Sequence, residues 1–150
     1  MADDAGVFLD TNVLVYAAVK ESPFYEAARR AIGESSQQGR VCWVSRQVIR
    51  EFLVTLTRPD AFSPPVEIGT VLDLADDLER RFQVAEDGAN VTRALHDLLR
   101  RVPVRGKKIH DANIVATMLA NGIRTLLTHN AADFDGFSDV IELRRLETSP

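Results

Sequence analysis

The stretch GVFLDTNVLVYA, residues 6–17, places three polar residues between two apolar segments. Residues 7–9 are typical of a short buried strand, and the apolar residues of 13–17 recur at helical spacing. The Asp-Thr-Asn sequence at 10–12 therefore stands where a strand turns into a helix. Because such corners hold ligands in parallel sheets, this stretch predicts both a fold and the place of a site.

The chain as a whole has the composition of an ordinary globular domain. It has 150 residues, of which 45% are hydrophobic and 27% charged. We expect one domain over residues 1–150, with a core over about 6–144 and a short C-terminal tail. No signal-peptide layout or long apolar run is present, so we expect a soluble cytoplasmic protein without a membrane anchor. The single cysteine, Cys42, excludes an internal disulfide, makes a poor zinc site and is expected to be buried.

Strand-like and helix-like segments alternate along the chain. The predicted strands are 7–9, 40–44, 83–85, 124–128 and a possible fifth at 140–143. The predicted helices follow the first corner and then cover 24–32 with Ser22 as N-cap, 46–57 with Ser45 as N-cap, about 64–82, 90–101 and 111–120. Strands separated by helices imply a parallel sheet with right-handed crossovers. The fold class is therefore α/β, a three-layer α/β/α sandwich with a central parallel sheet of four to five strands.

Four acidic residues occupy positions that this architecture brings toward one sheet edge. Asp10 follows the first strand, Glu51 lies two turns into the helix after the second, Asp111 starts a helix, and Asp133 follows the fourth strand. Taken singly, each has a structural explanation: Asp10 and Asp111 as N-caps, Glu51 as a surface acid beside Gln47, and Asp133 as a turn former. Taken together, they indicate a site.

Converging carboxylates repel one another unless a cation neutralises them. Carboxylate oxygens and water suit Mg²⁺ or Mn²⁺, whereas zinc prefers the His and Cys ligands that this set lacks. The natural reaction of such a site is attack of metal-activated water on a phosphodiester. Neutral polar side chains that would bind ligands, water or phosphate flank the acids: Thr11, Asn12, Thr128 and Asn130.

The segments LDTNVLVYA, VSRQVIREFLVTLTRP and GKKIHDANIVATMLANGIRTLLTHNAADF jointly resemble the PIN-domain family, most closely the VapC-type toxin ribonucleases of type II toxin–antitoxin systems. The resemblance covers residues 7 to about 143. It implies an Mg²⁺- or Mn²⁺-dependent endoribonuclease, frequent homodimers and inhibition by a small VapB-like antitoxin. It also implies Asp10, Glu51 and Asp111 as the main acidic residues, with Asp133 as the fourth.

In the expected mechanism Asp10 and Asp111 are the chief metal-binding carboxylates. Glu51 and Asp133 bind a second ion or orient the attacking water. Either of two histidines, His110 and His129, could act as a base or bind phosphate, although capping or loop hydrogen bonding explains both as well.

The net charge of −4 weighs against a general nucleic-acid coat protein, yet cations gather before the third acid. They are Arg100, Arg101, Arg105, Lys107 and Lys108. For the two arginines that close a helix, a solvated face that complements the helix dipole is an equal alternative. The others are expected in a loop, where they would guide an RNA backbone. Single-stranded or loop RNA is the expected substrate, since A-form duplex hides its base edges.

Two other classes of function fit parts of the pattern. A haloacid-dehalogenase-like phosphotransferase would use Asp10 as nucleophile, but that family has a second Asp where this chain has Asn12. A catalytically silent RNA- or protein-binding module would use the acids only as caps, and divalent ions would then not stabilise the fold.

Overall fold

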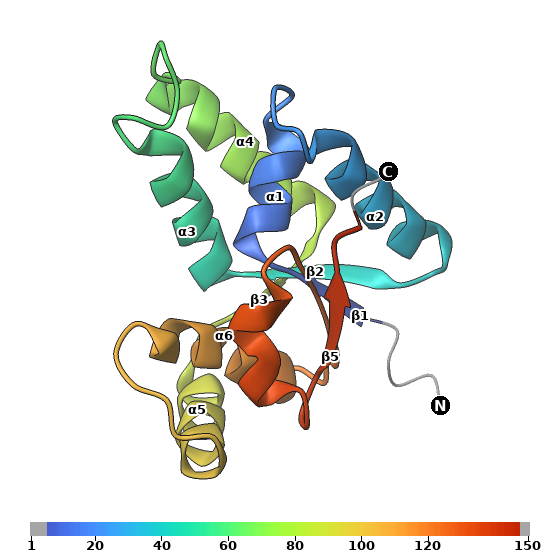
Figure 1. Ribbon diagram of the computed structural model, residues 1–150, viewed down its shortest axis with the longest axis vertical. Helices are drawn as coiled ribbons and strands as arrows, with labels where there is room; N and C mark the ends of the chain where they lie inside the picture. The colour runs from blue at the N-terminus through green and yellow to red at the C-terminus, as the bar shows by residue number, and fades with distance from the viewer. Residues whose placement is uncertain (1–5, 148–150) are drawn as a thin grey trace.

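The computed structural model describes residues 6–147 and contains a five-stranded parallel sheet (Figure 1). The strands run in the order β3-β2-β1-β4-β5, with β1 at the centre. Their bounds are Gly6–Leu9 for β1, Val41–Ser45 for β2, Gln83–Ala85 for β3, Thr125–Thr128 for β4 and Glu142–Arg145 for β5. All pairings among them are parallel, so their carboxyl ends share one edge. The predicted fold class is confirmed.

Helices cover both faces of the sheet, and two groups of them are visible in Figure 1. The first group contains α1 (Thr11–Ala18), α2 (Tyr25–Gln37), α3 (Arg46–Thr57) and α4 (Ile68–Arg81). The second contains α5 (Ala89–Arg101) and α6 (Lys108–Ala120), which pack against each other, and the 3₁₀ helix η2 (Ala131–Phe137) contacts α6. No helix of residues 6–147 is long and apolar enough to cross a membrane.

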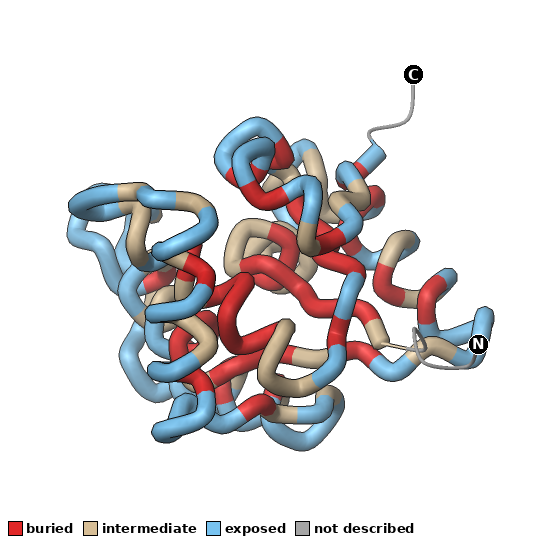
Figure 2. Tube along the Cα trace, turned by 90° about the horizontal axis from the view of Figure 1, so that it is seen from below, coloured by how far each residue is buried: buried red, intermediate tan, exposed pale blue. Residues whose placement is uncertain are grey.

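The core lies on both faces of the two central strands. Residues 7–9 of β1 and all four residues of β4 are buried, and Figure 2 shows buried segments gathered in the middle of the molecule. Helices on both faces explain why these strands are continuously apolar rather than alternating. Cys42, on β2, is buried as predicted.

Several element boundaries differ from the sequence prediction. The Ser22 hydroxyl accepts a hydrogen bond from the Phe24 amide, but α2 begins only at Tyr25 and continues to Gln37. Helix α4 begins at Ile68, after an extended stretch, because proline suits extended chain as well as a first helical turn. The fifth strand is 142–145 and not 140–143, since the amides of 140 and 141 close a turn onto the Phe137 carbonyl.

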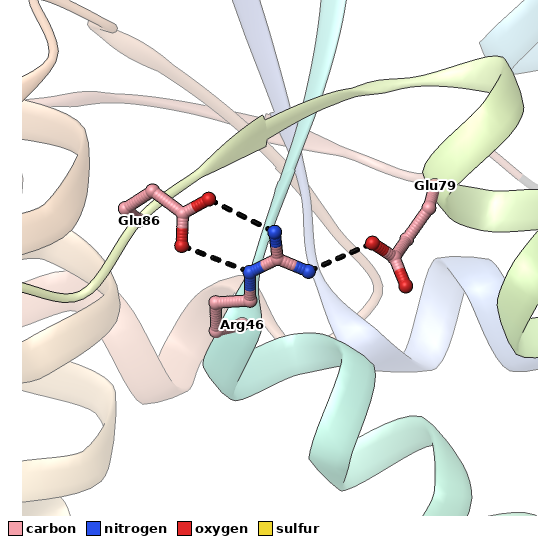
Figure 3. Close-up of polar contacts among 3 residues, drawn as sticks. All are labelled: Arg46, Glu79 and Glu86. Carbon is pink, nitrogen blue, oxygen red and sulfur yellow. Dashed lines mark hydrogen bonds and ion pairs between the residues drawn. The ribbon is translucent and has the colours of Figure 1, made fainter.

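An ion-pair fork joins the start of α3 to Glu86, which directly follows β3, and to Glu79 of α4 (Figure 3). Arg46 donates from Nε and Nη2 to the two carboxylate oxygens of Glu86, both at 2.9 Å, and from Nη1 to Glu79 at 2.8 Å. The three side chains are solvent-exposed to a large degree. The fork lies beside Ser45, whose hydroxyl accepts from the Val48 amide and caps α3 as predicted.

Candidate active site

Asp10 lies at the carboxyl edge of the sheet, where β1 ends. Its amide donates to the Leu127 carbonyl of β4 at 3.0 Å, which fixes the backbone. One carboxylate oxygen, Oδ1, accepts from the Thr11 amide at 2.8 Å, so Asp10 is the N-cap of α1 as one prediction had it. The other, Oδ2, accepts from the Thr128 hydroxyl at 2.7 Å. Asp10 and Thr128 thus lie at the same edge of the sheet, as expected for residues that end parallel strands, and because β1 and β4 are neighbours their side chains are in contact.

The Asp10 carboxylate is costly to ionise in this place. Only 7% of the residue is exposed, and this burial raises the pKa of Asp10 from 3.8 to about 6. Hydrogen bonds from Thr128 and Thr11 lower the pKa, whereas the charges of Glu51 and Asp111 raise it again. Capping a helix does not require a carboxylate that is buried among other acids, so the cap alone does not account for this residue.

Glu51 faces the same edge from α3. Its Oε1 accepts from the Thr11 hydroxyl at 2.9 Å, and its Oε2 accepts from Gln47 Nε2 at 3.1 Å. Both donors are neutral, so neither places a positive charge beside the carboxylate. The surface-acid explanation does not describe Glu51, because both oxygens are held by half-buried or buried partners.

Asp111 lies in the first turn of α6 and is not its N-cap, because the helix begins three residues earlier, at Lys108. The backbone turns at Gly106, whose φ is +61°, and enters the helix directly. Burial raises the pKa of Asp111; the nearby Lys108 ammonium, 3.5 Å from Oδ2, lowers it, and the charges of Asp133 and Glu51 raise it. Lys108 also donates to the Asp133 carbonyl, so it bridges the two acidic segments.

The predicted supporting residues lie where the four acids meet. Asn12 donates from Nδ2 to Asp10 Oδ2 at 3.3 Å and accepts from the His129 amide at 3.1 Å. The Asn130 amide donates to the Thr128 hydroxyl at 3.0 Å. These contacts fasten the loop after β4 to the start of α1.

A cavity of about 420 Å³ contains all four acidic residues. It is lined by Asp10, Glu51, Asp111 and Asp133, by the predicted Thr11, Asn12 and Asn130, and by Val15, Tyr16, Val54, Thr55, Arg58 and Phe134. Sequence reasoning missed Arg58, a cation at the C-cap of α3 that also lines this cavity. A larger cavity of about 670 Å³ contains none of the four acids, so chemistry and not volume identifies the site.

The predicted basic residues are placed differently from the acids. Arg100 and Arg101 end helix α5 as predicted, and Arg100 pairs with Asp97 at 3.0 Å. Lys108 is helical rather than in a loop and contacts the acidic segments. None of the five is among the residues that line the acidic cavity. The structure therefore does not bring the basic segment into the cavity itself.

Neither histidine lines the cavity. The His129 ring packs against Tyr16 and Phe24, with ring centroids 5.3 and 4.4 Å apart. His110 contributes its backbone carbonyl, which accepts from Gln47 Nε2 at 2.9 Å. The ring of His129 thus packs among aromatic side chains, whereas the contact of His110 is made by its backbone.

The donor chemistry of the cavity fits a hard divalent cation. It offers carboxylates whose pKa values are raised by burial and by one another, and a cation would relieve both effects. Within residues 6–147, no three His, Cys, Asp or Glu side chains form a ready-made ligand set. Carboxylate oxygens are the ligands that hard divalent cations such as Mg²⁺ or Mn²⁺ prefer.

Comparisons with known proteins agree with the fold and the motifs. The family model described as "PIN domain" matches residues 7–140. Ribonuclease VapC48 of Mycobacterium tuberculosis is 27% identical over 135 residues, covering 87% of this chain and 91% of the relative.

Two solved structures share the fold at low sequence identity. VapBC2 from Rickettsia felis, bound to a DNA fragment from its promoter, has a TM-score of 0.69 at 18% identity, covering 95% of this chain and 99% of that one. VapC20 of M. tuberculosis, a sarcin-ricin loop cleaving toxin, has a TM-score of 0.64 at 19% identity, covering 90% and 95%. The resemblance drawn from the sequence motifs is confirmed.

Proposed function

This chain belongs to the PIN domain family, and from that premise we propose that it is a metal-dependent endoribonuclease, the toxin of a VapBC-type toxin–antitoxin pair. The observation that carries the proposal is the single cavity lined by four carboxylates. Asp10 is the most informative of the four carboxylates. It is only 7% exposed and lies close enough to Glu51 and Asp111 for their charges to raise its pKa, so its charge does not stabilise the fold.

In this proposal Asp10 and Asp111 are the chief ligands of a divalent cation, Mg²⁺ or Mn²⁺. A cation held there by Asp10 and Asp111 would supply the positive charge that offsets the carboxylates and the Lewis acidity that this hydrolysis requires. Glu51 and Asp133 bind a second ion or orient water. Thr11, Thr128 and Asn12 hold the carboxylates with neutral donors, which leaves the charge of the acids for the cation.

The substrate in this proposal is single-stranded or loop RNA. The relative VapC20 is described as cleaving a loop, the sarcin-ricin loop. Arg58 is a cation among the residues that line the cavity and would contact a phosphate of the RNA backbone there. The basic segment, Arg100, Arg101, Arg105, Lys107 and Lys108, would guide the backbone from outside the cavity.

A VapB-like antitoxin is the proposed protein partner, because several solved relatives are toxin–antitoxin complexes. A cavity of about 300 Å³ offers apolar side chains from α1, α2 and α4 to such a partner. We also propose a homodimer, a cytoplasmic location and a single nuclease domain over 1–150. The phosphotransferase and binding-module alternatives gain no support from the family match.

The test is cleavage of labelled single-stranded RNA, pooled tRNA and ribosomal RNA by the purified protein. Reactions contain Mg²⁺, Mn²⁺ or EDTA. The proposal predicts discrete products with either ion and none with EDTA. Product formation that is equal with EDTA, or no product from any RNA with either ion, would overturn it.

A further inference from the structure

Gln47 is a buried polar residue that the proposed reaction has not used. It lies in the first turn of α3, one turn before Glu51, and only 5% of it is exposed. Burying an amide costs free energy unless its hydrogen bonds are made. Its partners therefore indicate what the residue does.

The Gln47 amide is fully engaged within the protein. Nε2 donates to Glu51 Oε2 at 3.1 Å and to the His110 carbonyl at 2.9 Å, so both of its N–H groups have acceptors. Oε1 accepts from Asn113 Nδ2 at 2.8 Å. The two acceptors on one side and the donor on the other determine which end of the amide is nitrogen.

These bonds connect the two helices that carry acids. Glu51 is on α3, whereas His110 and Asn113 are on α6 and flank Asp111 in the sequence. One amide thus ties the Glu51 carboxylate to the first turn of α6. Asn113 Nδ2 also lies 3.3 Å from Asp87 Oδ2, which extends the network to the loop after β3.

The Glu51 carboxylate is held at both oxygens. The Thr11 hydroxyl, from α1, holds Oε1 at 2.9 Å, and Gln47 holds Oε2. Two donors from different elements fix the rotation of the carboxylate as well as its place. A lysine at position 47 would supply a donor too, but it would neutralise the charge, which the neutral amide preserves.

We propose that Gln47 is a positioning residue that sets the Glu51 carboxylate relative to Asp111 by hydrogen-bonding Glu51 and the His110 carbonyl at once. This inference rests on the proposed function and deepens it. Outer partners of metal-binding carboxylates typically contribute about 10–100-fold to metal affinity or activity. Gln47 would therefore affect turnover and ion binding without touching the RNA.

The test uses Gln47→Met, which keeps the length of the side chain and removes its hydrogen bonds, with Ser35→Ala as the matched control. Ser35 is also buried, and its hydroxyl donates to Ala31 within α2, away from the acidic cavity. Three quantities are measured for each protein: Tm, kcat and KM on one RNA, and the Mn²⁺ concentration that gives half of the maximal rise in Tm.

Gln47→Met is expected to lower kcat by about 10–100-fold with KM changed less than about threefold. Half-maximal thermal stabilisation should require several-fold more Mn²⁺, and raising Mn²⁺ should restore part of the lost rate. A purely structural role would lower Tm alone.

Asn113→Ala provides the same test at a less buried residue, in case Gln47→Met does not fold. It removes the contact that orients the amide, so kcat should fall in the same direction by a smaller factor. If kcat and the Mn²⁺ requirement of Gln47→Met, or of Asn113→Ala in its place, match those of Ser35→Ala, the inference is overturned while the proposed function stands. If the wild type shows no metal-dependent cleavage, the proposed function is overturned and the inference falls with it.

Discussion

Asp10→Asn should make the metal-free protein more stable at neutral pH, although it removes a proposed catalytic acid. Burial raises the pKa of Asp10 from 3.8 to about 6, so at pH 7 the folded protein holds an unfavourable charge. A shift of about 2 units corresponds to about 3 kcal/mol at 1.36 kcal/mol per unit. Asparagine removes that charge and can still accept from the Thr11 amide.

The substitution also loses hydrogen bonds, which reduces the gain. An NH₂ group in place of Oδ2 cannot accept from Asn12 or from the Thr128 hydroxyl, a loss of about 1–2 kcal/mol. The net expectation is about 1–2 kcal/mol of added stability in EDTA, or a rise in Tm of roughly 3–6 °C for a domain of this size.

The pH dependence follows from the direction of the shift. A carboxyl group whose pKa is raised by folding stabilises the folded state below its unfolded pKa, and this contribution is lost as pH rises through the folded value. The stability of the wild type relative to the variant should therefore fall between about pH 4 and pH 7. Divalent ions should reverse the order, since only the wild type gains about 2.7 kcal/mol at 100 times its Kd.

The assay is urea denaturation of both proteins in EDTA across this pH range, repeated with Mn²⁺ at neutral pH. Matching pH dependences of the two proteins would refute the reasoning about burial. So would a variant that is less stable than the wild type in EDTA at pH 7.

Three further substitutions probe the surroundings of the acids. Thr128→Val removes a buried hydrogen-bond donor to Asp10, so the pKa of Asp10 should rise further. Urea titrations at neutral pH should show a free energy of unfolding lower by about 1–2 kcal/mol. An unchanged free energy of unfolding would contradict the role of the hydroxyl. Lys108→Met removes the ammonium beside Asp111, so the pKa of Asp111 should rise. Because this ammonium repels a cation at the same carboxylate, Mn²⁺ should bind the variant several-fold more tightly in thermal titrations. Weaker binding of Mn²⁺ would show that Lys108 does not compete with the ion. Arg46→Met removes the exposed ion pairs with Glu79 and Glu86. The resulting loss in Tm should be small and should decrease at high salt, because salt screens exposed charges. A loss in Tm that does not depend on salt would indicate that the aliphatic part of the arginine side chain stabilises the fold by packing.

The sequence predicts the sheet and its edge because both depend on short-range patterns. Continuous apolar runs predict the central strands, and a parallel sheet then places positions 10 and 128 at one edge. Their direct contact depends on β1 and β4 being neighbours, which the sequence does not predict. Helix starts are predicted less well because their signals are local and ambiguous. A Ser-Pro pair precedes α2 and another precedes α4, yet in both places the chain continues beyond the pair before the helix begins.

The parts of the site that the sequence does not reveal come from tertiary contacts. Gln47 appears in the sequence only as a neighbour of Glu51 on one helix, whereas its decisive partners are on α6, 63 and 66 residues away. The sequence predicts Lys108 in a loop, where it would guide RNA. Because α6 begins at Lys108, this residue and Asp111 lie three apart on one helix, and the ammonium of Lys108 contacts the Asp111 carboxylate. Arg58 lies at the end of the quoted segment VSRQVIREFLVTLTRP, but nothing in the sequence distinguishes it from other surface cations, and the cavity lining identifies it.

The central claim is that Asp10 and Asp111 act together with a divalent ion to cut RNA. The most direct measurement is the single-turnover cleavage rate of one labelled RNA as a function of Mn²⁺ concentration. It compares the wild type with Asp10→Asn, Asp111→Asn and the control Ser35→Ala. We predict a saturable dependence on Mn²⁺ for the wild type and the control, and a loss of more than about 100-fold in both Asp variants at every concentration. Equal rates in all four proteins, or cleavage that is independent of Mn²⁺, would contradict the account.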